Sequence, residues 1–373
     1  MTTQHDDFTI IRAWQEIICR AIHARATDIH VEAHECKTAI RIRVDGELHP
    51  LHIQTYLEHE RIIARIKVLA RLDIAESRLP QDGRLLVGID YSHPNVDCRV
   101  SILPTLHGEK AVLRLLPSPT HDLSLNLLGL LSEQLAILQN AIQQPDGLIL
   151  VTGPTGSGKT RTLYSCLNQL NTTGRNLCSI EDPIEIRLAG VNQVAYHPKA
   201  GLDFNHIIGA LLRQDPDVIL IGEIRDAATA ELALQAAQTG HLVFSSLHTR
   251  SAIASVERLR SLGIANDRLR SSLRCISSQR LVRQICSACL GTPSADGCKQ
   301  CAGVGLFDRI GVHEILPFTN AIADAFERHT SISELTDCAK EVGFTDMRSA
   351  GMHHVQHQRI TLSELEAQLG SWY

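Results

Sequence analysis

The sequence predicts an α/β fold with a parallel sheet, preceded by a smaller α+β domain. Two patterns along the 373 residues carry this prediction. From about residue 28 to residue 116, short stretches of alternating polarity surround one helical stretch, as in a compact α+β domain. From about residue 124, short and nearly continuous apolar stretches alternate with helices, as expected of strands buried on both faces of a parallel sheet. We therefore expect an N-terminal domain over residues 1–117 and a larger domain over residues 118–373.

The elements expected in the N-terminal domain begin with a strand at residues 38–44, where polar and apolar side chains alternate before an Asp-Gly turn. Residues 58–73 carry isoleucine, leucine and alanine at helical spacing and predict a helix. Further strands are expected at residues 85–90, 96–103 and 110–116. The segment Pro-Ser-Pro-Thr at residues 117–120 predicts the linker between the domains.

The elements expected in the larger domain include four buried strands with helices between them. The strands are predicted at residues 148–151, 176–180, 218–221 and 242–246, and two of the helices at residues 160–171 and 227–238. After residue 319 the chain becomes polar and helical, so residues 319–373 are expected to form a helical C-terminal part. We found no internal repeat or low-complexity tract.

Composition and charge favour a globular protein and disfavour nucleic-acid binding. The hydrophobic share is 44% and the charged share 21%, as in ordinary soluble domains. The net charge of −5 gives the chain no electrostatic footprint for nucleic acid, although a local basic patch would be hidden in that total. The first residues are polar and acidic, and no apolar stretch is long enough to cross a bilayer. We therefore expect a cytosolic protein that binds membranes only through a partner.

The most specific motif has the P-loop pattern G-x-x-x-x-G-K-[ST] and stands between an apolar strand and a helix, where that pattern has physical meaning. Its residues are Gly153, Pro154, Thr155, Gly156, Ser157, Gly158, Lys159 and Thr160. The glycines allow backbone N–H groups to point inward at phosphate oxygens. Lys159 can then reach the β- and γ-phosphates, and the Thr160 hydroxyl can ligate Mg²⁺.

Acidic side chains follow two of the predicted strands. Glu223 comes after the apolar run at residues 218–221, where a carboxylate can hold the Mg²⁺ shell or orient a water molecule. Glu181, Asp182 and Glu185 directly follow another strand. These three carboxylates either polarise water and bind Mg²⁺ or form a solvated Asp-Pro turn, and the sequence leaves both readings open.

Histidines and arginines add further candidates that are weaker when taken singly. His241 and His248 bracket the strand at residues 242–246, and a histidine at the carboxyl end of such a strand can contact a γ-phosphate. An arginine from a neighbouring domain or subunit can stabilise the charge that develops in phosphoryl transfer. The arginines near strand ends or turns are Arg99, Arg114, Arg213, Arg225 and Arg309.

Four of the 11 cysteines form two CxxC pairs, and they predict a closed zinc site. The ligands would be Cys286, Cys289, Cys298 and Cys301. Four thiolates suit tetrahedral Zn²⁺ and leave no open position for a substrate, so the role would be structural. A thioredoxin-like motif would instead need a single CxxC at the start of a helix.

The ordered motifs resemble those of the type II secretion and type IV pilus assembly ATPases. The resemblance extends over nearly the whole chain from about residue 20. Besides the P-loop and the cysteine pairs, its motifs are Ala26-Thr-Asp-Ile-His30, Arg78-Leu-Pro-Gln-Asp-Gly-Arg84, the segment at residues 103–114, Ser179-Ile-Glu-Asp-Pro-Ile-Glu185, Leu212-Arg-Gln-Asp-Pro-Asp217, Gly222-Glu-Ile-Arg-Asp226, Ala237-Gln-Thr-Gly-His241, Leu247-His-Thr249 and Arg309-Ile-Gly-Val-His-Glu314.

The resemblance implies a homohexamer of two-domain subunits, each with a PAS-like N-terminal domain and a RecA-like ATPase domain that carries a zinc-binding insertion at residues 284–303. ATP would bind where subunits and domains meet. Hydrolysis would turn an inner-membrane platform protein that adds pilin subunits to a filament. The enzyme would be cytoplasmic and peripheral at the inner membrane, with ATP, Mg²⁺ and Zn²⁺ bound.

The resemblance also implies a role for each candidate residue. Glu223 would be the catalytic acid, and Arg99 and Arg114 would reach the γ-phosphate from the N-terminal domain. The acidic box would be Glu181, Asp182 and Glu185, and the histidine box His241 and His248. Positions important for activity or subunit contacts would be Arg213, Arg225 and Arg309.

Several alternatives stay open within and beyond this family. Few residues precede the first motif, so we expect the module that docks secretion ATPases to be absent, which favours pilus or competence-type assembly. A retraction ATPase is disfavoured by the double CxxC. A non-hydrolysing subunit is disfavoured by Lys159, Thr160 and Glu223, although Gly209 stands where relatives often carry arginine. A DNA-translocating RecA-like motor is disfavoured by the acidic net charge.

Overall fold

The chain divides into two compact units, Met1–His121 and Asp122–Tyr373. The computed structural model describes residues 3–35, 37–53, 58–88, 96–116, 122–196, 204–292, 297–301, 303–328 and 332–370. The predicted linker at residues 117–120 and the end of the strand predicted at residues 85–90 lie outside the described residues.

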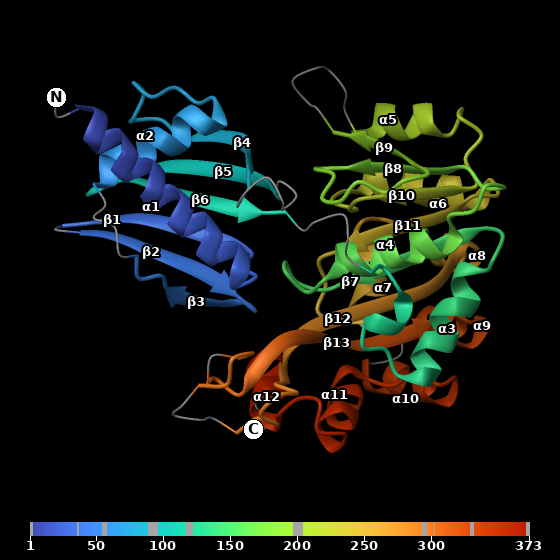
Figure 1. Cartoon of the computed structure of the whole chain (residues 1–373). Coiled ribbons are helices and arrows are strands. Elements are labelled where there is room, and N and C mark those ends of the chain that lie inside the picture. Colours follow the sequence, from blue (N-terminus) through green and yellow to red (C-terminus); the bar gives the residue numbers. More distant parts are fainter. Residues whose placement is uncertain are drawn as a thin grey trace. The chain divides into compact units, whose positions relative to one another are not determined.

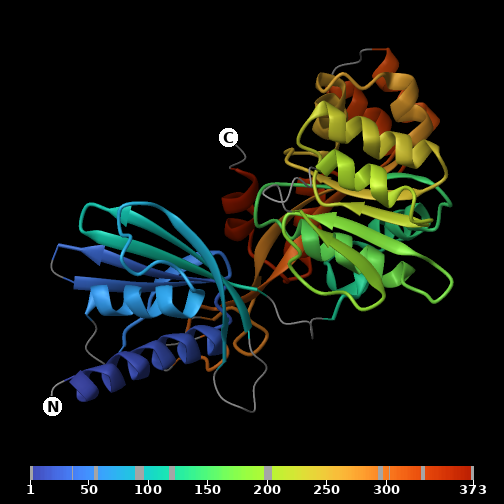
Figure 2. The same cartoon turned by 90° about the horizontal axis from the view of Figure 1, so that it is seen from above.

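The first unit is a six-stranded antiparallel sheet with helices α1 (Thr3–His23) and α2 (His59–Ala70) on one face (Figure 2). The strands follow the order β3-β2-β1-β6-β5-β4. Their bounds are β1 (Asp28–His34), β2 (Lys37–Val44), β3 (Glu47–Pro50), β4 (Gln81–Val87), β5 (Val96–Thr105) and β6 (Gly108–Leu115). The core lies between sheet and helices, where Ile17, Ile29 and Ile66 are fully buried. Helix α1 was not predicted, although Ala13, Ile17 and Ala21 recur at helical spacing along it.

The second unit is a seven-stranded sheet in the order β13-β12-β7-β11-β10-β8-β9 (Figure 1). Its strands are β7 (Gly147–Thr152), β8 (Leu177–Glu181), β9 (Val191–Ala195), β10 (Val218–Ile221), β11 (Leu242–Leu247), β12 (Leu273–Ile285) and β13 (Leu306–Pro317). Neighbouring strands are parallel except for β12 and β13, which form an antiparallel pair. The predicted α/β fold with a parallel sheet is therefore confirmed.

Helices cover both faces of this sheet and bury it in two separate cores. One core contains residues of α3 (Ser132–Ile142) and α4 (Lys159–Leu170). The other core is covered by α5 (Phe204–Leu211), α6 (Ala227–Gln238), α7 (Ala252–Ser261), α8 (Asn266–Ser272), α9 (Asn320–Glu327) and α10 (Ile332–Glu341). Helices α11 (Met347–Gln356) and α12 (Leu362–Leu369) pack against β12 and β13, and a short 3₁₀ turn, Leu125–Leu127, precedes α3.

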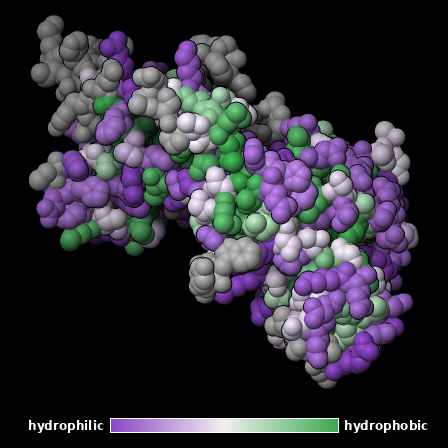
Figure 3. Space-filling model, turned by 90° about the horizontal axis from the view of Figure 1, so that it is seen from below, coloured by the Kyte–Doolittle hydropathy of each residue, from purple (hydrophilic) through white to green (hydrophobic). Residues whose placement is uncertain are grey.

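On the face shown in Figure 3, hydrophilic and hydrophobic residues are interspersed. Among the helices that the structure describes, none is long and apolar enough to cross a membrane.

Candidate functional site

The carboxyl ends of four adjacent parallel strands bring most of the predicted site residues to one edge of the second unit. Strand β7 leads into the P-loop, β10 into Gly222-Glu223 and β11 into His248, while β8 ends at Glu181. Because these strands are parallel neighbours in the order β7-β11-β10-β8, their carboxyl ends share an edge.

The P-loop backbone has a positive φ at each of its three glycines, a conformation that glycine adopts more easily than other residues. Gly153 has φ +142° and Gly158 has φ +90°. Helix α4 then begins at Lys159, so its N-terminal N–H groups and positive dipole end face the loop. The Lys159 ammonium donates to the carbonyl oxygens of Gly153 at 2.9 Å and Pro154 at 3.0 Å. Burial lowers the pKa of Lys159, and the charges of Glu223 and Glu185 partly oppose that effect.

Glu223 lies in a polar network at this edge. Its Oε2 is 3.1 Å from His248 Nε2, and its Oε1 accepts a hydrogen bond from the Arg225 guanidinium. Arg225 Nη2 also donates to Asp182 Oδ2 at 3.4 Å. The Glu223 side chain is 23% exposed, so it remains accessible to a water molecule or ligand. Four of the predicted residues are thus joined in one hydrogen-bonded group.

Glu181 occupies a different environment from the other acids of its box. It is buried, and its Oε1 accepts hydrogen bonds from Ser179 Oγ at 2.7 Å and Gln193 Nε2 at 3.1 Å. Its Oε2 accepts from the hydroxyl of Tyr164, a fully buried residue of α4. Burial raises the pKa of Glu181, and these three hydrogen bonds partly oppose the shift. Its neighbours in the acidic box, Asp182 and Glu185, are exposed.

The structure does not bring the two predicted histidines together within the unit. His241 precedes β11 and His248 follows it, so six residues of extended chain separate them, or about 20 Å. His241 Nδ1 lies 2.9 Å from the Ala236 carbonyl oxygen at the end of α6. His241 therefore lies at the opposite edge of the sheet from the P-loop.

Arg213 and Arg309 lie on other elements of this unit. Arg213 Nη1 donates to the Gly209 carbonyl at 2.7 Å, just after α5. Within the described part of the chain a side chain at Gly209 would meet open space, since outside its own helix backbone no described atom lies within 4 Å of the position of its Cβ. Arg309 is on β13, directly opposite Arg283 of β12.

Arg99 and Arg114 belong to the first unit, where the sheet register places them side by side. Arg99 of β5 pairs with Arg114 of β6 on one side and with Arg84 of β4 on the other. Arg114 in turn pairs with Asp28 of β1, and its Nε donates to Asp28 Oδ1 at 3.0 Å. Like charges directly opposite each other destabilise an antiparallel sheet, so a row of three arginines is suited to an anionic ligand. Arg84 was not among the predicted site residues, and its proximity follows only from the register.

The four cysteines of the two CxxC pairs converge at the tip of the β12–β13 hairpin. All four sulfur atoms lie within 4.8 Å of one another, with Cys286 and Cys298 at 3.8 Å and Cys289 and Cys301 at 3.6 Å. Tetrahedral ligands at about 2.3 Å from Zn²⁺ would be about 3.8 Å apart, so the donor set fits zinc. The Gly305 N–H also donates to Cys301 Sγ at 3.2 Å.

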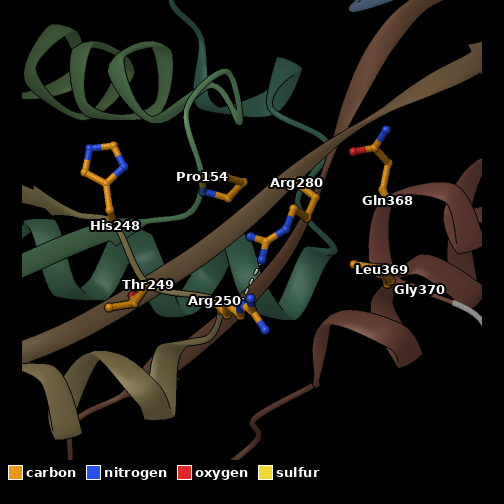
Figure 4. A pocket seen from close by; sticks show the side chains of 8 residues that line it. All are labelled: Pro154, His248, Thr249, Arg250, Arg280, Gln368, Leu369 and Gly370. Carbon is orange, nitrogen blue, oxygen red and sulfur yellow. Dashed lines mark hydrogen bonds between the residues drawn. The ribbon is translucent and has the colours of Figure 1, made fainter.

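A cavity of about 420 Å³ opens beside the P-loop and was not predicted from the sequence. Its walls are Pro154, His248, Thr249, Arg250, Arg280 and the end of α12 at residues 368–370 (Figure 4). The Arg280 guanidinium is directed toward Arg250 and donates to its carbonyl oxygen at 3.0 Å. Burial lowers the pKa of Arg280, and the nearby charge of Glu314 partly opposes that shift. No motif marks these two arginines, so their place beside the P-loop emerges only in the fold.

A P-loop at the carboxyl edge of a parallel sheet, with an acid on a neighbouring strand, defines the chain as a P-loop nucleotide-binding protein. A family model described as Type II/IV secretion system protein matches residues 3–367, and the chain belongs to this family.

Two relatives and one solved structure show the extent of the similarity. The Escherichia coli K12 protein named Protein transport protein HofB homolog is 45% identical over 368 residues, covering 94% of this chain and 79% of the relative. The Pseudomonas aeruginosa type IV pilus assembly ATPase PilB is 40% identical over 387 residues, covering 98% and 68%. A crystal structure of the pilus retraction motor PilT with bound ADP has a TM-score of 0.69 at 28% identity, covering 95% of this chain and 96% of that one. The predicted resemblance to the secretion and pilus ATPases, and the enzyme class that it implies, are confirmed at the level of the family.

Proposed function

We propose that this chain hydrolyses ATP and that hydrolysis drives assembly of a pilus or pseudopilus filament. The observation that carries the proposal is the group formed by Glu223, Arg225 and His248 beside the P-loop. Assembly is favoured over retraction because the pilus assembly ATPase of Pseudomonas aeruginosa is 40% identical to the chain, against 28% for the retraction motor.

The residues of the second unit would share the chemistry as follows. The P-loop N–H groups and the Lys159 ammonium would bind the β- and γ-phosphates, and the Thr160 hydroxyl would ligate Mg²⁺. Bound Mg²⁺ supplies positive charge that offsets the charge developing on the phosphates. Glu223 would orient the attacking water and accept its proton, with Arg225 and His248 fixing the carboxylate. Asp182, joined to Arg225, and the exposed Glu185 would complete the acidic edge.

Arginines of the first unit would add positive charge to the γ-phosphate from a neighbouring domain or subunit. Arg99 and Arg114 are the candidates, and Asp28 holds the Arg114 side chain through Nε. A contribution from a neighbouring subunit requires an oligomer, and we propose a homohexamer, with Arg213 and Arg309 at subunit contacts. The partner would be an inner-membrane platform protein, which would place the enzyme in the cytoplasm at the membrane surface. His241, remote from the P-loop of its own unit, would act at such a contact or through α6.

The cysteine cluster would hold one structural Zn²⁺ that closes the tip of the β12–β13 hairpin. Metal analysis of protein purified without added chelator should find about one zinc per chain, and Cys298→Ser should abolish it. Zinc retained in the variant, or absent from the wild type, would contradict this assignment.

ATP hydrolysis by the size-fractionated, zinc-replete protein tests the proposed function. We expect turnover in the oligomeric fraction and its loss in Lys159→Ala, because that side chain binds the phosphates in the proposal. Turnover that survives in Lys159→Ala at the wild-type level would contradict the proposed site. If the wild type binds no ATP at all, the proposed function itself fails.

A further inference from the structure

Gln279, a buried residue of β12, lies directly against the P-loop. The register explains its position, since Ser278 of β12 is opposite Thr152, the last residue of β7 before the P-loop. Gln279 is therefore level with Gly153, the first residue of the loop. Its side chain is uncharged, belongs to no motif considered above, and is 2% exposed.

The Gln279 amide connects the loop to the helix that follows it. Its Nε2 donates to the Ser157 carbonyl oxygen at 2.7 Å, and its Oε1 accepts from the Thr162 hydroxyl of α4 at 2.8 Å. Thr162 is itself buried. A reversed amide would place its oxygen against the Ser157 carbonyl, so the two bonds fix one orientation.

The glycines of the loop permit this close approach. A Cβ at Gly153 would stand 2.6 Å from the Gln279 carbonyl oxygen, closer than two such atoms can approach. A Cβ at Gly158 would stand 3.1 Å from Gln279 Nε2. The lack of a Cβ at Gly153 and Gly158 therefore leaves room for Gln279, in addition to allowing the positive φ of these two residues.

From these contacts we infer that Gln279 is a positioning residue of the nucleotide site, one that holds the P-loop in its phosphate-binding form; the inference rests on the proposed function. In a planar trans peptide the carbonyl and the following N–H point in opposite directions. The bond from Gln279 to the Ser157 carbonyl thus directs the Gly158 N–H away from β12, toward the side on which phosphate binds. The bond to Thr162 fixes the first turn of α4 against the same amide.

The test compares nucleotide affinity with stability in the full-length, zinc-replete protein. Gln279→Met keeps the length of the side chain and removes both hydrogen bonds. For Gln279→Met we expect the dissociation constant of a fluorescent ATP analogue and the KM for ATP both to rise about tenfold or more, with a smaller change in kcat. Because the variant leaves a buried carbonyl and a buried hydroxyl unpaired, the melting temperature without nucleotide should also fall. The affinity is the readout that decides, since a merely structural residue would lower the melting temperature and leave the affinity intact.

Matched variants separate the two hydrogen bonds and control for local disturbance. Thr162→Val removes only the bond to α4 and should weaken binding less than Gln279→Met, and Thr162→Ser should restore binding. Ser277→Ala is the control, because Ser277 lies two residues earlier on the same face of β12 and its buried hydroxyl has no hydrogen-bond partner within the described part of the chain. Its affinity should match the wild type.

The outcomes distinguish this inference from the proposed function. A wild type that does not bind the ATP analogue contradicts the proposed function. A wild type that binds it, together with unchanged affinity in Gln279→Met, overturns the inference alone. Should Gln279→Met fail to fold, equal affinities in Thr162→Val and Thr162→Ser would overturn it instead.

Discussion

Two carboxylates at the ends of neighbouring strands, Glu181 after β8 and Glu223 after β10, have almost opposite environments. The register pairs Ile180 with Ile221, so Gly222, rather than Glu223, is level with Glu181. Glu181 is still the last residue of its strand and accepts hydrogen bonds from the buried Tyr164 and Ser179 and from the half-buried Gln193. Glu223 stands two residues beyond Ile221, the last residue of β10, where Arg225 and His248 contact it. A difference of one residue in register therefore separates a core carboxylate from an accessible one.

This contrast suggests a division of labour, in which Glu181 acts through Tyr164 to fix α4 behind the P-loop and Glu223 performs the chemistry. It departs from the role that the family resemblance gave to Glu181 as part of an acidic box around the nucleotide. The two carboxylates should therefore differ in what they contribute to stability and to activity.

The largest expected effect on stability follows from removing the buried carboxylate. Glu181→Ala leaves the buried hydroxyls of Tyr164 and Ser179 without their acceptor, and each unsatisfied group costs about 1–3 kcal/mol. The melting temperature should therefore fall by about 4 °C or more. Glu223→Ala, the matched variant at the accessible site, should change the free energy of unfolding by about 1 kcal/mol or less. Equal losses of stability in Glu181→Ala and Glu223→Ala would contradict the difference between the two carboxylates.

A smaller effect is expected from removing one of those donors. Tyr164→Phe deletes the hydroxyl that donates to Glu181 Oε2 and should cost about 1–3 kcal/mol in thermal or urea unfolding. Arg225→Gln removes a donor to Glu223 instead, and since that arginine is 60% exposed, stability should hardly change. A Tyr164→Phe protein as stable as the wild type would show that the buried network does not fix α4.

The smallest expected effect is a dependence of stability on pH. The folded-state pKa of Glu181 is raised, so the unfolded chain loses this proton at a lower pH than the folded chain does. The free energy of unfolding of the wild type should therefore fall relative to that of Glu181→Gln as pH rises from about 4.5 to the raised pKa. Above the raised pKa the difference between the two proteins should stay constant. Melting temperatures of both proteins between pH 4 and pH 8 measure this difference. A difference in melting temperature that is constant over that range would mean that burial does not shift the pKa of Glu181.

The sequence was sufficient for the elements that local pattern determines. The strands β7, β8, β10 and β11 and the helices α4 and α6 agree with the predicted ranges to within a residue or two, because buried strands and amphipathic helices carry their own periodicity. The P-loop and the cysteine pairs were equally readable, since their chemistry depends on short, fixed spacings.

The parts that sequence reasoning missed depend on contacts between distant segments. Gln279 forms hydrogen bonds with Ser157, 122 positions away in the sequence, and with Thr162, 117 positions away. No pattern in the sequence near Gln279 indicates these partners. Arg84 joins Arg99 only through the register of β4 and β5. The burial of Glu181 depends on a tyrosine 17 positions earlier and a glutamine 12 positions later. Local pattern therefore located the acidic residues and could not separate their environments.

The most direct test of the account is ATP turnover by Glu223→Gln and Glu181→Gln measured side by side, with nucleotide binding measured on the same samples. Both substitutions keep the shape of the side chain and remove its charge. We expect Glu223→Gln to lose about a thousandfold or more in kcat while still binding ATP, because it removes the general base. Glu181→Gln should keep kcat within about tenfold of the wild type. A loss in Glu181→Gln as large as that in Glu223→Gln would contradict the division of labour between the two carboxylates.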